Sequence, residues 1–215
     1  MQASWQKWVP LTGILFVVLF IVGIGFASGP ENNQSDQEIV DWYAKSSHQT
    51  SVIIGAYVLA VAGVAFLLFV NRLRAVVAAA EGPQPIFATF IFASGVIFVV
   101  GLAIAAGAMA AVSGGVKFGD QPNATNADVV RFLPQLGFGA LLLGGIFPLI
   151  FGLFTTAIAS MRLNIFPSWF NWLTIICAII LFFAALFLPL IALGVWLIAA
   201  SIQLMKHQPG ATAAA

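Results

Sequence analysis

The sequence predicts an all-α, polytopic helical bundle embedded in a membrane, and three observations support this fold class. Of the 215 residues, 61% are hydrophobic and only 7% are charged, whereas a soluble domain carries roughly a quarter charged residues. The mean hydropathy is +1.05. The long apolar runs contain no Asp, Glu, Lys, Arg or His. We therefore expect residues 1–207 to form a single transmembrane helical domain and residues 208–215 to be a disordered tail.

The first apolar run predicts a helix over residues 10–27, with Trp5 and Trp8 anchoring one end at the interface. The polar segment after it contains Ser35 and Glu38 at the spacing of a capping box. Apolar residues follow this box directly. We therefore expect a short amphipathic helix that lies on the membrane surface outside the cytoplasm.

The next two apolar runs predict helices over residues 51–80 and 85–112, separated by Gly82-Pro83. In the second of these, small residues recur at every fourth position: Ala103, Gly107 and Ala111. Small residues at this spacing allow another helix to approach closely. The stripe is interpreted first as an intramolecular packing face, and a homodimer seam is the alternative.

The polar segment 113–133 repeats the pattern of the first one. Thr125 and Asp128 match a second capping box, so we expect a second short extracytoplasmic amphipathic helix. A fourth membrane helix is predicted over residues 134–160. In it Pro148 cannot donate a hydrogen bond to the carbonyl of Gly144, so we expect a kink in mid-membrane.

The last apolar run, residues 170–205, decides the topology. As one helix it would be about 54 Å long, against a hydrocarbon core of roughly 30 Å. Two helices fit better, and the split is expected near Phe187-Leu188, with Pro189 in the first turn of the sixth helix. A fold with five transmembrane helices is the alternative.

Positive residues near membrane ends favour the cytoplasmic side, and this rule supports six helices. With both termini in the cytoplasm, the basic residues inside are Lys7, Arg72, Arg74, Arg162 and Lys206, and those outside are Lys45, Lys117 and Arg131. A fold with five helices would move Lys206 outside and divide the basic residues evenly. We therefore expect six helices with cytoplasmic N- and C-termini.

The sequence contains few residues that could perform chemistry within a membrane. Proton-coupled transport and ion-pair gating rest on ionisable side chains at membrane depth, and the apolar runs have none. Neither histidine lies in a predicted span, so a haem ligand is absent there. We expect no enzyme activity, no cofactor, no metal site and no nucleic-acid binding. The expected partners are the lipid bilayer and other membrane proteins.

Three sets of residues are the candidates for function. Gly144, Gly145 and Pro148 could form a broken helix whose free carbonyl groups line a solute path, or a kink that only improves packing. Ala103, Gly107 and Ala111 form the packing stripe. Trp42 and Tyr43, in the first surface helix, could contact a partner protein or lie on lipid.

Four motifs in this order resemble an uncharacterised family of bacterial, especially actinobacterial, six-helix integral membrane proteins of unknown function. The motifs are KWVPLTG at residues 7–13, EIVDWYA at 38–44, NRLR at 71–74 and FPSWFNWL at 166–173. The resemblance covers nearly the whole chain. It implies six helices and a bacterial cytoplasmic (inner) membrane, and it implies no activity or site residues.

The sequence therefore predicts a non-catalytic integral membrane protein that acts as an accessory or interaction component of a larger membrane assembly. The alternative from a different class is a passive channel or facilitator for a small neutral or lipidic solute, built around the kinked helix at Pro148.

Overall fold

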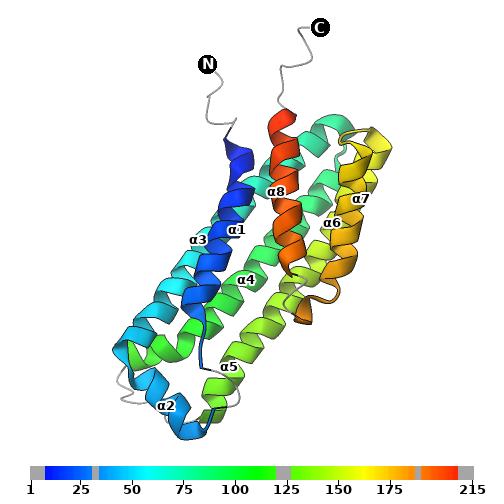
Figure 1. Ribbon diagram of the computed structural model, residues 1–215. Helices are drawn as coiled ribbons and strands as arrows, with labels where there is room; N and C mark the ends of the chain where they lie inside the picture. Colours follow the sequence, from blue (N-terminus) through cyan, green and yellow to red (C-terminus); the bar gives the residue numbers. More distant parts are fainter. Residues whose placement is uncertain (1–7, 31–33, 120–126, 187–189, 208–215) are drawn as a thin grey trace.

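The computed structural model describes residues 8–30, 34–119, 127–186 and 190–207. Every regular element in these ranges is helical, and the helices pack into one elongated bundle (Figure 1). Four helical stretches are long and apolar enough to cross a membrane: Val9–Ala27, Ser46–Glu81, Ile86–Phe118 and Asp128–Leu163. The prediction of an all-α bundle is therefore confirmed. The predicted tail, residues 208–215, lies outside the described residues.

The first three long helices follow the predicted order. A 3-10 turn, η2 (Val9–Leu11), leads into α1 (Thr12–Ala27). α3 (Ser46–Glu81) begins before the predicted start at residue 51, and α4 (Ile86–Phe118) continues beyond the predicted end at residue 112. The extension of α3 is polar and that of α4 begins with Ser113, Gly114 and Gly115, where hydropathy alone does not mark the end of a helix.

The turn between α3 and α4 is closed by its own residues. Gly82, with φ 90°, adopts a backbone conformation that residues with a Cβ rarely take. The Glu81 carboxylate accepts hydrogen bonds from the backbone N–H groups of Phe87 and Ala88 at 2.8 and 3.0 Å. These bonds satisfy donors that would otherwise lack a partner in the first turn of α4.

The first surface helix forms as predicted. α2 (Asp36–Ala44) starts with the capping box, in which the Ser35 N–H donates to Glu38 Oε2 at 2.8 Å and the Glu38 N–H donates to Ser35 Oγ at 3.4 Å. The backbone hydrogen bond from Ser35 lowers the pKa of the Glu38 carboxyl. Ile39 and Tyr43 face inward and are buried.

The prediction of a second, separate surface helix is wrong. α5 (Ala127–Gly139) continues through η3 (Ala140–Ile146) into α6 (Phe147–Leu163) without a break, and Pro134 lies inside α5. Val130, in the first turns of α5, is buried in a small cluster with Ile39 and Tyr43. The helix continues across Pro134, which the sequence rule treats as a start. Thr125 of the second capping box lies outside the described residues.

The disturbance expected around Pro148 takes the form of a π-helical stretch. η3 covers the seven residues before α6, and at its end the Phe147 N–H donates to the carbonyl of Leu142. Pro148 lies in the first turn of α6, where its missing N–H is tolerated. The i to i+5 pattern of a π-helix is a common local adjustment where a proline interrupts a membrane helix.

The final apolar run forms two helices, as predicted. α7 (Ser168–Leu181) is followed by a 3-10 turn, η4 (Ala184–Leu186), and then by α8 (Leu190–Lys206). The predicted split, residues 187–189, lies outside the described residues. At about 21 and 26 Å these helices are shorter than a 30 Å hydrocarbon core. The turn at η4 lies well short of the end of the bundle where α2 and the start of α5 lie (Figure 1).

Aromatic residues fill the core where α1, α3 and α4 meet. The rings of Phe16, Phe66 and Phe98 are nearly fully buried, and their centroids lie 4.7 to 5.9 Å apart. α8 joins this core through Trp196, whose ring meets that of Phe69 edge-on at 5.8 Å. Both ends of the described chain lie at the same end of the bundle, where an Arg72 guanidinium N–H donates to the carbonyl of His207.

Candidate functional site

A cavity of about 420 Å³ lies between α1, α2, α4, α5 and the start of α8, and we call it the α1–α5 pocket. Most of its lining is apolar: Ile24, Ala27, Met109, Phe138, Leu141 and Leu190. Polar side chains join the lining at Ser28, Tyr43 and Gln135. Ligand sites are typically concave, largely apolar and supplied with a few polar groups, in a volume of roughly 300–1,000 Å³. The pocket has these properties.

Leu190, the first residue of α8, lines the pocket together with residues near the end of α1, in α5 and in η3. The turn η4 lies well short of the end of the bundle that carries α2 (Figure 1). The pocket lies between α2 and the start of α8, because Tyr43 and Leu190 both line it.

Tyr43 is the central polar residue of this region. Its side chain is only 2% exposed, and burial raises the pKa of its hydroxyl, so the group stays protonated at neutral pH. It also lines a neighbouring cavity of about 80 Å³, which shares Gly29 and Pro134 with the α1–α5 pocket and reaches Arg131. Tyr43 therefore lines both of these adjoining cavities.

Arg131 is held in place by α2. Its guanidinium donates to Asp36 Oδ1 at 2.5 Å and to the carbonyl of Gln34 at 2.7 Å. The Asp36 carboxylate is mostly exposed, so solvent screens this ion pair and its contribution to stability is small. The pair ties α2 to the start of α5 and places hydrogen-bond donors beside the smaller cavity.

The sequence-predicted pair Trp42 and Tyr43 does not form an open partner surface. Tyr43 is buried, and the Trp42 ring stacks on the His48 ring at 4.4 Å. Gln49 Nε2 donates to the carbonyl of Tyr43 at 2.7 Å, which fastens the end of α2 to α3. Ser35 and Glu38 predicted the helix, but only the packing against Val112 and Val130 decides which way its aromatic residues point.

The residues predicted to form a solute path do not face one common space. A Cβ added at Gly101 would lie 2.8 Å from the Cα of Gly145, so α4 and η3 are in backbone contact there. A Cβ added at Gly144 would meet nothing within 4 Å, and Gly144 is exposed on the outside of the bundle. Neither these glycines nor Pro148 line the two cavities described above.

The stripe of Ala103, Gly107 and Ala111 does not form the predicted intramolecular packing face. All three residues are exposed, and the space around Gly107 is open. α4 instead packs through a neighbouring set of small residues, including Gly95, Gly101 and Ala105. Small residues occur on both sides of α4, so their spacing alone could not distinguish the packed side from the exposed side. The homodimer seam stays a prediction.

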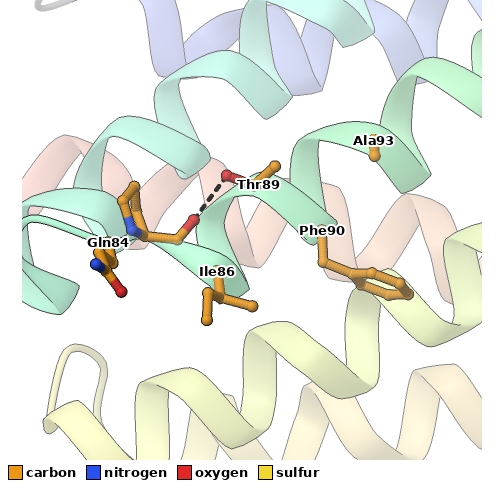
Figure 2. Close-up of a pocket in the computed structure, with 6 residues that line it drawn as sticks. Gln84, Ile86, Thr89, Phe90 and Ala93 are labelled. Atoms are coloured by element: carbon orange, nitrogen blue, oxygen red, sulfur yellow. Dashed lines mark hydrogen bonds between the residues drawn. The ribbon is translucent and has the colours of Figure 1, made fainter.

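A second groove, of about 510 Å³, lies beside the start of α4 (Figure 2). Its lining residues all come from the turn before α4 and the first turns of that helix, among them Ile86, Thr89 and Phe90. The Thr89 hydroxyl is already engaged, because it donates to the carbonyl of Pro85 at 2.6 Å (Figure 2). A single segment holds a ligand from one side only, so this groove is a weaker candidate than the α1–α5 pocket.

Sequence reasoning did not find the α1–α5 pocket. Ser28 lies directly after an apolar run and Gln135 directly after Pro134, and nothing in their local sequence indicates that the two residues share a cavity. Within the described ranges, no group of three or more His, Cys, Asp or Glu side chains could hold a metal ion.

The chain was also compared with known proteins. No protein family matches it, and no curated protein or solved structure matches it either.

Proposed function

We propose that this chain is a non-catalytic integral membrane protein of a bacterial cytoplasmic membrane, with six embedded helices, of the kind that its sequence motifs resemble. The observation that carries the proposal is the apolar outer surface of the bundle. Large hydrophobic side chains point outward from successive helices, for example Ile21, Val100 and Leu143, which is 77% exposed. Contiguous apolar surface of this extent is rare on soluble monomers and is expected where helices face lipid.

We propose that both termini lie in the cytoplasm. The end of the bundle where the first and last described residues lie also carries the basic residues Arg72, Arg74, Arg162 and Lys206. The end near α2 carries Lys45, Lys117 and Arg131 together with most of the carboxylates. The excess of basic residues, to which Lys7 adds in the sequence, favours the terminal end as the cytoplasmic one.

Cysteine labelling tests this topology. We expect His207→Cys to react with a membrane-impermeant maleimide in inside-out vesicles and not in intact spheroplasts. Cys177 is buried and provides a low background. Labelling of position 207 only from the outside would contradict the cytoplasmic placement and would favour five spans.

Within the membrane, we propose that the protein acts as an accessory component that contacts another membrane protein. The exposed stripe Ala103, Gly107 and Ala111 supports this role, because small residues on an outer face let a second helix approach to backbone distance. The alternative, a solute path around Pro148, has less support, since Gly145 is in backbone contact with Gly101.

Purification in mild detergent, followed by identification of co-purifying membrane proteins, tests the accessory role. We expect a specific partner whose recovery falls about fivefold or more with Gly107→Leu, since a closely packed helix pair cannot accept the larger side chain. Gly25→Leu is the matched control, because a Cβ at that glycine also meets nothing within 4 Å. Repeated recovery of a lone monomer would contradict the role.

A further inference from the structure

We propose that the α1–α5 pocket binds an acyl-chain amphiphile that enters from the lipid, with its tail along α1 and an acceptor-bearing head group beside Tyr43. The inference rests on the membrane embedding proposed above and does not depend on the accessory role. It assigns a class of ligand to a pocket whose lining residues all come from this chain.

The tail site is longer than the α1–α5 pocket itself. A groove of about 280 Å³ between α1 and α8 is lined only by apolar residues and shares Leu190 with the pocket. On α1, Val17, Phe20 and Ile21 line the groove, and Ile24, Ala27 and Ser28 line the pocket. These positions recur every three to four residues and therefore form one continuous stripe on a single face of the helix.

The lining changes from apolar to polar along this stripe. Ser28 follows Ile24 by one helical turn, about 6 Å, in the direction of α2. Along the continuous helix of α5 and η3, Gln135 lies about 9 Å before Leu141 in the same direction. The polar side chains are therefore at the α2 end, and the apolar side chains extend toward the middle of the bundle. An amphiphile has the same arrangement of one polar end and one apolar tail.

The polar end offers mainly hydrogen-bond donors. The Tyr43 hydroxyl is protonated, and the Gln135 side chain has two amide donors. Arg131 lines the adjoining cavity, but its guanidinium already donates to Asp36 and to the carbonyl of Gln34. Ser28 Oγ already donates to the carbonyl of Ile24 at 2.8 Å. Donors select a head group with acceptor oxygens, so a carboxylate, phosphate or ester oxygen fits this end.

The position of the pocket explains why a lipid-derived tail would enter it. Leu190, at the start of α8, lines the pocket together with Ile24 and Leu141, and in an embedded bundle the hydrocarbon outside is the nearest material that can fill it. The side chains that line an unfilled apolar cavity lack dispersion contacts on the side that faces the cavity. Each methylene group that enters recovers part of them.

Photocrosslinking of the full-length protein in detergent tests the proposal, with a diazirine-bearing palmitate as the probe. We expect the labelled residues to cluster on α1 around Ile24 and on η3 around Leu141, and labelling to saturate. Gln135→Trp should reduce this labelling about fivefold or more by filling the pocket. Leu136→Trp is the matched control, because Leu136 is exposed on the neighbouring position of the same helix. Labelling spread evenly over all exposed apolar side chains would overturn the proposal.

A second variant tests the tail site without filling the polar end. Gly194 lines the α1–α8 groove, where an added Cβ would lie 3.6 Å from Val17, so Gly194→Phe should block the groove. We expect it to weaken competition by oleate and leave competition by decanoate unchanged. Equal effects on both competitors, or on neither, would contradict a tail that extends along α1.

The choice of competitor distinguishes a free fatty acid from a bilayer lipid as the source of the amphiphile. Competition by oleate alone indicates a free fatty acid, and competition by phosphatidylglycerol vesicles indicates a bilayer lipid. If neither competes, the binding assignment is wrong. The labelling of His207→Cys distinguishes this failure from a failure of the proposed embedding, because it reports on topology independently of any ligand.

Discussion

Replacing Gly55 with leucine is expected to destabilise the protein by about 3 kcal/mol or more. A Cβ at this position would lie 2.5 Å from the backbone nitrogen of Ala27 and 2.8 Å from the carbonyl oxygen of Gly23. Both neighbours are backbone atoms of α1, so the clash cannot be relieved by rotating a side chain. Overpacking a core costs about 1–3 kcal/mol, and a rigid neighbour raises this cost.

Thermal unfolding in detergent measures the effect of Gly55→Leu. For a chain of this size, a loss of 3 kcal/mol corresponds to a fall in Tm of about 6–12 °C. Gly25→Leu on α1 is the control, because the space around Gly25 is open and the expected change is within about 0.5 kcal/mol. Similar midpoints for the two variants would show that α1 and α3 do not pack through this glycine.

Replacing Trp196 with alanine is expected to cost about 3–5 kcal/mol, the range found for large aromatic residues in a core. Trp196 is 2% exposed, and its Nε1–H donates to Thr174 Oγ1 at 3.0 Å. Its ring also meets Phe69 edge-on. One side chain therefore joins α8 to both α7 and α3, and its loss should release the hairpin from the bundle.

Two further variants separate the contributions of Trp196. Trp196→Phe retains most of the packing and removes the hydrogen bond, so we expect a loss of about 1 kcal/mol. Thr174 would keep a partner, because its hydroxyl also donates to the carbonyl of Phe170 at 2.8 Å. Trp172→Ala on α7 is the matched control, since Trp172 is exposed and should change the midpoint little. Equal losses for the alanine variants at 172 and 196 would contradict the docked hairpin.

Features that depend on local sequence were predictable. The apolar runs placed the helices, and the Ser35–Glu38 capping box placed the start of α2. The length of the run over residues 170–205 predicted a break, because one apolar helix of that length would exceed the thickness of a hydrocarbon core. Each of these conclusions depends on residues close together in the chain or on the thickness of the bilayer.

Which side of each helix faces the core of the bundle was not predictable in the same way. In a soluble bundle, polar residues mark the exposed side of a helix, but a helix surrounded by lipid and protein is apolar on all sides. Gly107 and Gly101 are the same residue type on the same helix, yet Gly107 is exposed and Gly101 contacts backbone. The position of Tyr43 depends similarly on Val112 and Val130, which come from distant segments.

The sequence by itself determined that this is an all-helical protein with apolar helices, a capped surface helix and a divided last run, because composition, caps and run lengths are local properties. The tertiary structure decided which residues face one another, that α5 passes through Pro134, and that the α7–α8 hairpin ends short of the bundle. The α1–α5 pocket lies beside the start of α8. It is a property of helices from different parts of the chain, and no single segment encodes it.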